Sequence, residues 1–338
     1  MKKFFITGTA GFIGFHLAKL LLKEGFKVHG YDSINGYYDV NLKYARQNIL
    51  LKDENFSTTK GLLEDNDKLN EVADKFQPDV IIHLAAQAGV RYSLENPRAY
   101  INSNIIGTFN VMEIAKKHKV KHLLMSSSSS VYGANINMPF KENDKVDTQL
   151  TIYAATKKSN ESMAHSYAHL WKIPTTMFRF FTVYGPWGRP DMAYFKFVSA
   201  ILNNKPIDIY NNGEMYRDFT YVDDLVNGIK LLVDCIPYNN EKISENDSLS
   251  PVAPFRMVNI GNSEKIKLID FIGEIEVSLN KKAIRNYMPM QKGDVTETWA
   301  DASLLQKLTN YKPKTNYKDG INNFISWYLD YYDEQIRH

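Results

Sequence analysis

Tyr153 and Lys157 lie one helical turn apart in a predicted helix, so both side chains project from the same face. A tyrosine is a poor base at neutral pH, because its ordinary pKa is about 10. A neighbouring ammonium group favours the tyrosinate and brings this pKa towards the working range. The hydroxyl of Ser128, in a serine run before this helix, could bond the same substrate oxygen. The pattern predicts proton removal from a substrate hydroxyl, with Tyr153 as the base.

The N-terminal segment Lys3–Gly14 predicts a short apolar strand, a tight turn and the start of a helix. Gly8 permits a turn that is closed to residues with a Cβ atom. Gly11 lets the backbone approach a phosphate, and Gly14 lets the helix pack close to the strand. The helix N-terminus suits a pyrophosphate. An acid about 20 residues further on, here Asp32, can bind an adenine ribose and repels a 2′-phosphate, which predicts NAD rather than NADP.

Small and polar residues follow two predicted strands at the points where the strands end. Residues 84–87 follow the fourth strand, and the serine run 126–130 follows the fifth. Ligands of open α/β sheets bind at this edge, outside the carboxyl ends of the strands. Small residues there let a cofactor lie close to the sheet. The serines indicate a site, although serines are also common in ordinary loops.

Strands and helices alternate along the chain to residue 181, which predicts a doubly wound parallel Rossmann sheet with right-handed crossovers. The fourth strand is almost continuously apolar, as expected for a parallel strand buried on both faces. The predicted strands after the first are Lys27–Tyr31, Phe56–Lys60, Asp79–Leu84, Lys121–Met125 and Thr175–Phe181. The predicted helices are Phe12–Lys23, Val40–Leu51, Tyr100–Lys119 and Tyr153–Trp171.

After residue 182 this rhythm changes, and the pattern predicts a smaller α/β substrate-binding lobe that caps the cleft. We predict an NAD-binding domain at 1–182 and a second lobe at 183–338, with the chain crossing back around 222–262; the family resemblance given below implies that this is a nucleotide-sugar-binding lobe. The expected elements are helix Phe195–Asn203, strands Ile207–Tyr210 and Arg217–Tyr221, helix Leu225–Val233, a surface loop Asn239–Pro254, strand Met257–Ile260, and helices Leu268–Leu279 and Asp319–Tyr332.

The bulk composition is that of an ordinary globular protein: 338 residues, 44% hydrophobic and 23% charged. A net charge of +3 is too small to indicate nucleic-acid binding. No apolar run approaches the ~18 residues of a membrane span. The N-terminus enters the first strand at once, leaving no room for a signal peptide. Cys235 is the single cysteine and is read as a core residue, so we expect a cytoplasmic protein in a reducing compartment.

These motifs resemble those of the extended short-chain dehydrogenase/reductases, specifically the nucleotide-sugar epimerases and most of all the UDP-glucuronate 4-epimerases. The resemblance runs nearly from end to end. Its carriers are Gly8-x-x-Gly11-x-x-Gly14, residues 83–91, Asn104-x-x-Gly107-Thr108, residues 126–133, Tyr153-x-x-x-Lys157, residues 179–193, Arg217-Asp218-Phe219 with Asp223-Asp224, and Gly293-Asp294-Val295.

The resemblance implies epimerisation of UDP-glucuronate to UDP-galacturonate, which supplies a precursor for surface polysaccharide. Tyr153 takes the proton from the sugar 4-hydroxyl while NAD accepts the 4-hydride. The 4-keto sugar turns over, and the hydride and proton return to the other face. Ser128 assists the proton transfer, and Lys157 tunes Tyr153 and holds the nicotinamide ribose. NAD is regenerated and behaves as a tightly held prosthetic group.

The resemblance also implies the binding residues. The cofactor set is Gly8, Gly11, Phe12, Ile13, Gly14, Asp32, Leu63, Leu84, Ala85, Ala86, Gln87, Asn104, Ser126, Tyr153 and Lys157. The substrate set is Ser129, Ser130, Thr182, Arg189, Tyr210, Arg217 and Asp294. The hydroxyls of Ser129, Ser130 and Thr182 suit a sugar carboxylate. Arg189 suits it too, and the alternative for Arg189 is a structural role in its loop. The Arg217 fork fits a diphosphate, and Asp294 fits the uridine ribose.

Related chemistries predict other residues at the serine run. Similar 4,6-dehydratases carry an Asp-Glu pair before Val-Tyr-Gly, and UDP-glucuronate decarboxylases carry a glutamate beside that valine. Here these positions are Ser129 and Ser130, which cannot readily supply the proton transfers. UDP-galactose epimerases usually place asparagine at the position of Thr182. The remaining alternatives are 4-epimerases of UDP-N-acetylglucosamine or of UDP-glucose and UDP-galactose, and a non-catalytic NAD-binding protein.

Two departures from the family pattern stand out. Gly61-Leu62-Leu63 replaces a Gly-Asp-Ile whose aspartate contacts adenine, so the backbone or Asp65 would hold the base. Lys292 stands where proline is common and either replaces a diphosphate arginine or is solvated.

Three further expectations concern surfaces. Family members are commonly homodimers, which implies a helix bundle of 100–119 and 153–171. Lys43 and Arg46 are expected on a solvated helix face rather than at a cofactor phosphate. His165 and His169 are read as a surface pair, and no metal site is predicted.

Overall fold

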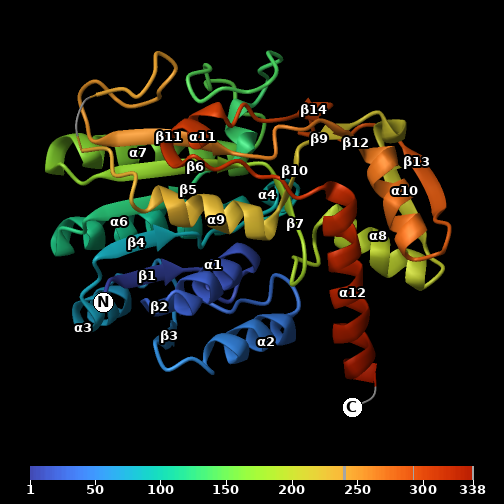
Figure 1. Cartoon of the computed structure of the whole chain (residues 1–338), viewed down its shortest axis with the longest axis horizontal. Coiled ribbons are helices and arrows are strands. Elements are labelled where there is room, and N and C mark those ends of the chain that lie inside the picture. The colour runs from blue at the N-terminus through green and yellow to red at the C-terminus, as the bar shows by residue number, and fades with distance from the viewer. Residues whose placement is uncertain (239–240, 292, 337–338) are drawn as a thin grey trace.

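The computed structural model describes residues 1–238, 241–291 and 293–336. A seven-stranded sheet forms its centre, in the order β11-β6-β5-β4-β1-β2-β3, with every neighbouring pair parallel (Figure 1). The strand order reverses between β1 and β4, which is where open α/β sheets bind ligands. The strands are β1 Lys3–Thr7, β2 Lys27–Asp32, β3 Phe56–Lys60, β4 Val80–His83, β5 His122–Ser126, β6 Thr175–Phe180 and β11 Phe255–Ile260.

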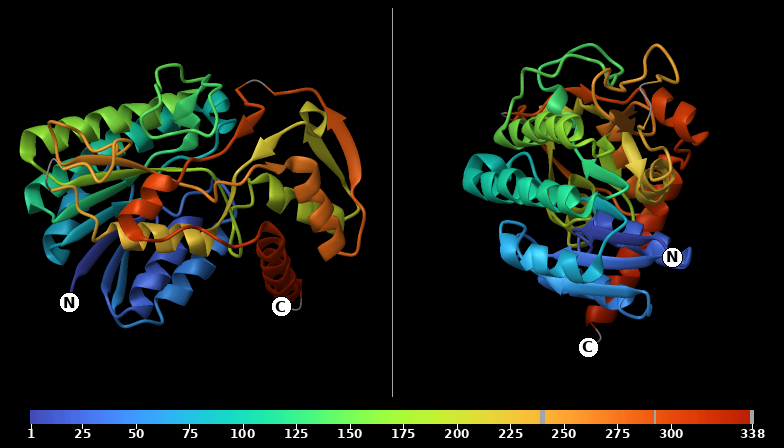
Figure 2. Two further views of the ribbon diagram at one scale, coloured as in Figure 1. Left: turned by 45° about the horizontal axis from the view of Figure 1, so that its top comes forward. Right: turned by 90° about the vertical axis from the view of Figure 1, so that its left-hand side faces the viewer.

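Helices cover both faces of this sheet, and a separate apolar core lies on each (Figures 1 and 2). One face carries α1 Phe12–Lys23, α2 Val40–Leu50, α9 Val222–Leu232 and α11 Ser303–Thr309. The other carries α3 Asn66–Phe76, α6 Gly107–His118 and α7 Ile152–Trp171. The doubly wound Rossmann architecture expected from the sequence is confirmed. None of the helices in the described ranges has the length and apolarity needed to cross a membrane.

A smaller lobe lies beyond one end of the sheet and has an aromatic-rich core of its own (Figure 1). Its elements are α8 Ala193–Leu202, β8 Pro206–Tyr210, β9 Tyr216–Arg217, β12 Ile266–Lys267, α10 Leu268–Ser278, β13 Ile284–Met288, β14 Glu297–Thr298 and α12 Tyr317–Ile336. Two short strands, β7 Thr182–Tyr184 and β10 Phe219–Tyr221, pair in parallel where the chain passes between the two parts.

The chain returns twice to the large sheet. The helix α9 packs against α1, and β11 then pairs with β6 at the edge of the sheet. A second return brings Leu304 and Leu305 of α11 into the same core. The domain limit at residue 182 stays a prediction.

Several elements differ from the sequence prediction. The helix α3 was not predicted, although Asp65 caps its N-terminus and Leu69 and Ala73 provide its buried face. The predicted helix 100–119 is divided into α5 Pro97–Tyr100, a π-helical turn Ile101–Ile106 and α6. Within the predicted surface loop, of which 239–240 lie outside the described residues, Asp247 is buried and pairs with Arg256.

Candidate active site

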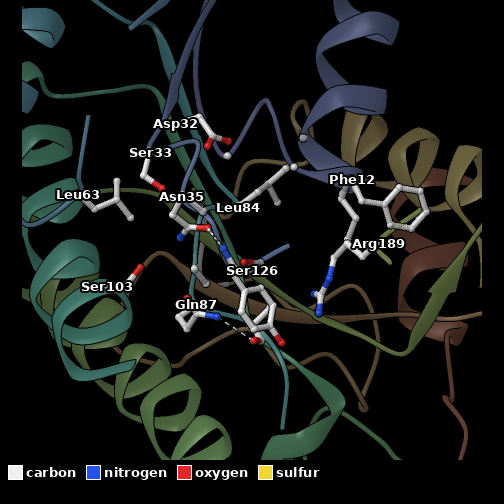
Figure 3. A pocket seen from close by; sticks show the side chains of 18 of the residues that line it. Phe12, Asp32, Ser33, Asn35, Leu63, Leu84, Gln87, Ser103, Ser126 and Arg189 are labelled. Carbon is white, nitrogen blue, oxygen red and sulfur yellow. Dashed lines mark hydrogen bonds between the residues drawn. The ribbon is translucent and has the colours of Figure 1, made fainter. Parts of the chain in front are cut away.

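A cavity of about 590 Å³ lies at the carboxyl ends of β1, β2, β4 and β5 (Figure 3). The structure brings nearly all of the predicted cofactor residues to its wall. These are Gly8, Gly11, Phe12, Ile13, Gly14, Asp32, Leu63, Leu84, Ala85, Ala86, Gln87, Ser126, Tyr153 and Lys157. Ser128 and Arg189 line the same cavity. The glycine turn, Tyr153 and Arg189 therefore share one space.

The glycine turn needs glycine at its first and third positions. Gly8 has φ +86°, and a Cβ atom there would lie 2.9 Å from the amide nitrogen of Ala85. A Cβ atom on Gly14 would lie 2.1 Å from the carbonyl oxygen of Gly8. Gly11 forms the N-cap of α1 without a side chain, so the first amides of the helix stay open to the cavity. This cradle fits a diphosphate, and the residues present therefore fit NAD.

Asp32 stabilises this turn and also faces the cavity (Figure 3). Its Oδ2 atom accepts a 2.9 Å hydrogen bond from the amide of Ala10, and its Oδ1 accepts one of 2.8 Å from Ile34. A carboxylate has about four acceptor positions, so capacity remains for a ribose. Leu62 and Leu63 line the wall nearby, whereas Asp65 accepts from the amide of Lys68 at the start of α3. Asp65 is thus a helix cap and not a cavity residue.

Tyr153 and Lys157 stand on the first turns of α7, whose N-terminus Thr151 caps by accepting from the Ala154 amide. Burial raises the pKa of Tyr153, while a hydrogen bond with Ser128 and the charge of Arg189 act in the opposite direction. Lys157 donates to the carbonyl of Ser126 at 2.9 Å and to its Oγ at 3.3 Å.

Burial lowers the pKa of Lys157 to about 8, against the opposing charge of Glu161. The charge of Arg189 also lowers the pKa of Tyr153 in this structure. The tuning of Tyr153 by Lys157 stays a prediction.

Arg189 projects into the cavity from the 185–192 loop, which follows β7 (Figure 3). It forms a forked ion pair with Asp191, with a distance of 3.0 Å between Nε and Oδ1. The hydroxyl of Tyr37 donates to Asp191 at 3.2 Å. Burial disfavours the guanidinium charge, but Asp191 outweighs burial and raises the pKa of Arg189. A permanent, positioned cation thus lies on the same wall as Tyr153.

Lys43 and Arg46 correct the sequence prediction of a solvated helix face, because both are buried. Lys43 lines the cavity and donates to the backbone oxygen of Asn35 at 2.7 Å and to its side-chain oxygen at 2.8 Å. Burial lowers the pKa of Lys43 to about 8. Sequence reasoning missed this inward orientation, because cations on a polar helix give no apolar signal.

A second cluster gathers predicted substrate residues away from this cavity wall. Arg91 makes a 3.1 Å ion pair with Asp294, and its guanidinium lies 4.5 Å from the ring centre of Tyr210. Arg217 donates to the carbonyls of Tyr216 and Val295, each at 2.8 Å. Burial lowers the pKa of Arg217, and Asp294 opposes this shift. Arg91 belongs to the motif at residues 83–91, and its place in this cluster was not predicted from the sequence.

The remaining predicted residues do not line the cavity. Ser129 and Ser130 open a short 3-10 turn, 129–132, in which Ser128 accepts from the Ser130 amide at 3.2 Å. Thr182 begins β7. Asn104 is buried and bonds both the amide and the carbonyl of Gln87, so it positions a wall residue. Lys292 lies outside the described residues.

His165 and His169 form hydrogen bonds with the loop that precedes β11. His165 pairs with the Ser250 hydroxyl at 2.8 Å, and His169 donates to the Val252 carbonyl at 2.8 Å.

Comparison with known proteins agrees with this geometry. The family model described as GDP-mannose 4,6 dehydratase matches residues 5–324. A probable UDP-glucuronate 4-epimerase of Rhizobium meliloti is 53% identical over 329 residues, which cover 96% of each chain. The crystal structure of UDP-glucuronic acid 4-epimerase from Bacillus cereus, in complex with UDP-glucuronic acid and NAD, has a TM-score of 0.87 and 31% identity, and the match covers 98% of this chain and 100% of that one. The chain belongs to the NAD-dependent nucleotide-sugar epimerases of the extended short-chain dehydrogenase/reductase family.

The similarity extends to a plant member of this epimerase family. UDP-glucuronate 4-epimerase 1 of Arabidopsis thaliana is 42% identical over 97% of this chain and 76% of its own length. The matching family model carries a dehydratase description, so the acids in the cavity are informative. Among the described residues, the acids that line it are Asp32 and Glu64, both outside the serine run. The serine-run positions that carry acids in related dehydratases are hydroxyls here, which fits an epimerase.

Proposed function

We propose that this chain catalyses the NAD-dependent 4-epimerisation of UDP-glucuronate to UDP-galacturonate. The carrying observation is that Arg189 and Tyr153 share one cavity and that the charge of Arg189 acts on Tyr153. A guanidinium on the wall of the same cavity suits a sugar with a carboxylate one carbon beyond the ring. The high identity to relatives described as UDP-glucuronate 4-epimerases supports the same substrate.

Tyr153 removes the proton of the sugar 4-hydroxyl and later returns it, while Ser128 donates to the same oxygen. When bound, NAD supplies the acceptor and later the donor of the hydride at sugar C4. The glycine turn and the N-terminus of α1 hold its diphosphate, and Asp32 holds the adenine ribose. Lys157 is held against Ser126, where it would bind the nicotinamide ribose and contribute positive charge.

The nucleotide end of the substrate is assigned to the second cluster, which contains Arg91, Tyr210, Arg217 and Asp294. Arg91 and Arg217 provide guanidinium donors for the diphosphate, and the Asp294 carboxylate accepts from the uridine ribose. Ser129, Ser130 and Thr182 are assigned to the sugar carboxylate. These roles, and that of Asn104 as a cofactor residue acting through Gln87, are part of the proposal.

The proposal includes a homodimer and a place in the cell. Two helical segments that pack against each other, the π-helical turn with α6 and the end of α7, expose apolar side chains. They are Ile101, Ile106, Phe109, Leu170 and Trp171. This stripe suits a two-fold helix bundle. We assign the reaction to the cytoplasm, because a single cysteine suits a reducing compartment. We assign the product to the supply of precursors for surface polysaccharide.

The test is product analysis after incubating the purified protein separately with UDP-glucuronate, UDP-glucose and UDP-N-acetylglucosamine, without added NAD. Conversion of UDP-glucuronate alone to its galacto epimer is the expected result, and it also shows that NAD co-purifies. Conversion of a neutral sugar instead would overturn the assignment of Arg189. A pentose product would show decarboxylation. No turnover with NAD supplied would favour a binding protein.

A further inference from the structure

Arg46 is a buried cation whose hydrogen bonds reach two separate parts of the site. Its Nη1 donates to the carbonyl of Ala10 at 2.9 Å and to the hydroxyl of Tyr38 at 2.8 Å. Its Nη2 donates to the carbonyls of Trp187 at 2.7 Å and Gly188 at 3.0 Å. The side chain is fully buried. One guanidinium therefore spans from the glycine turn to the loop that carries Arg189.

The 185–192 loop receives a second bond from the same side. His16 of α1 donates to the carbonyl of Pro186 at 2.9 Å. Trp187, between these bonds, has φ +59°, a backbone conformation that non-glycine residues rarely adopt. Such a conformation persists only where the surroundings hold it. The bonds from α1 and α2 provide that hold on the residues just before Arg189.

The charge of Arg46 is unusual because no carboxylate in the described ranges lies within ion-pair distance of it. Its bonds end on neutral oxygens. A buried cation without a countercharge is costly. The Ala10 carbonyl belongs to the turn that is shaped for an anionic diphosphate, and a bound dinucleotide would bring negative charge to that turn. Occupation of the turn would then supply negative charge on the side of Arg46 that bonds the Ala10 carbonyl.

We infer that Arg46 is a positioning residue that ties the 185–192 loop to the glycine turn, so that the bound dinucleotide and Arg189 are held in register. The inference rests on the proposed function for its catalytic consequence. In this inference Arg46 does not contact the substrate and affects it only through the position of Arg189. If Arg46 had only a structural role, its substitution would lower stability, but its effect on activity would not depend on the presence of Arg189.

A double-mutant cycle separates these two roles. We expect Arg46→Met to lower kcat/KM for UDP-glucuronate by at least tenfold, mainly through KM. In the Arg189→Met background the same change should cost less than threefold, because its target is already absent. Equal losses in both backgrounds would overturn the inference. Arg256→Met is the matched control: it removes a buried arginine, paired with Asp247 at the opposite end of the sheet, and its effect should be additive with Arg189→Met.

Hydrogen exchange of residues 185–192 gives a readout that needs no turnover. Adding NAD to cofactor-depleted wild-type protein should slow exchange in this segment, and Arg46→Met should abolish the slowing. An unchanged response to NAD in the variant would overturn the inference.

If Arg46→Met does not fold, two other variants test the inference. His16→Leu removes the hydrogen bond to the Pro186 carbonyl. Arg46→Lys keeps the positive charge but lacks the two Nη groups that bond both parts of the site. Each is expected to give a partial loss of the NAD response, and a full response in both would again contradict the inference. A wild-type protein that does not convert UDP-glucuronate would refute the proposed function alone, since the exchange experiment still tests the link.

Discussion

Glu161 accepts a 2.6 Å hydrogen bond from Ser127, the residue beside Ser128, and stands one helical turn beyond Lys157. The same carboxylate forms a buried fork with Arg179, with distances of 2.9 Å and 3.0 Å. It therefore connects the Ser127 side chain to α7, the helix that carries Tyr153. Its negative charge also opposes the effect of burial on Lys157.

Glu161→Gln should shift the alkaline limb of the kcat profile to lower pH. The pKa of Lys157, which burial already lowers to about 8, falls further without the opposing charge, so the ammonium is lost earlier as pH rises. Stability should fall by about 3–5 kcal/mol because Arg179 loses its buried partner. Urea unfolding and pH–rate profiles measure both effects. Glu276→Gln, which removes a buried carboxylate paired with Arg285, should reduce stability without moving the limb.

Tyr153→Phe should reduce kcat by about 10²- to 10⁴-fold, the usual contribution of one positioned acid–base group. The ring packing is kept, so the protein should retain co-purified NAD and its melting temperature. Tyr167→Phe on the same helix removes a hydroxyl that bonds Glu113 outside the cavity, and kcat should be unchanged. Turnover by Tyr153→Phe at the wild-type rate would assign the base to another residue.

Gly14→Ala should abolish NAD retention and reduce stability. The added Cβ atom would lie 2.1 Å from the Gly8 carbonyl oxygen, so either the glycine turn or α1 must move. Cofactor content from absorbance and thermal melts check this result. Gly273→Ala is the matched control, since its added Cβ meets nothing within 4 Å on α10. That variant should gain about 0.5–1 kcal/mol from lower unfolded-state freedom and keep its NAD.

Acid should destabilise the protein from about pH 6.5 downwards through its buried histidines. Burial lowers the pKa of His29 and His122 to about 4 and that of His83 to about 3. The unfolded chain binds these protons below the ordinary pKa of about 6.5 while the folded chain does not. Each histidine then removes up to about 1.4 kcal/mol of stability per pH unit as pH falls.

His29→Gln should flatten this dependence in urea unfolding between pH 6.5 and pH 5, a window that lies above most carboxylate titrations. Ser57 and Thr59, which bond His29, can still pair with the glutamine amide. An unchanged slope would show that His29 does not contribute in this range.

The sequence was sufficient where the signal is local. A strand, glycine turn and helix within residues 3–23 required Gly8 and Gly14 for steric reasons, and the spacing of Tyr153 and Lys157 placed both on one helix face. The serine run at a strand end pointed to the correct edge of the sheet. These inferences needed only periodicity and backbone sterics.

The sequence was insufficient where a role depends on a distant partner. The carbonyls of Trp187 and Gly188 that Arg46 bonds are 141 and 142 residues away in the sequence, and nothing in the α2 segment signals these contacts. Arg91 was overlooked for the same reason, since its partner Asp294 is 203 residues away in the sequence. Lys43 bonds the nearby Asn35, and its burial was missed because a cation on a polar helix gives no apolar signal. The helix α3 has only two fully buried residues, Leu69 and Ala73, so its apolar period was too weak to recognise.

The late return of β11 affects how the chain can be made and divided. β6 lies between β5 and β11, yet β11 is formed by residues 255–260, after part of the smaller lobe. A fragment ending near residue 182 would leave β6 as a bare edge and would uncover the face of α1 on which α9 packs. Unpaired edges of this kind recruit other chains. During synthesis, the large sheet therefore cannot be completed until residues 255–260 have been made. Until then the nascent chain exposes the β6 edge and the α1 face, and it is most prone to aggregate.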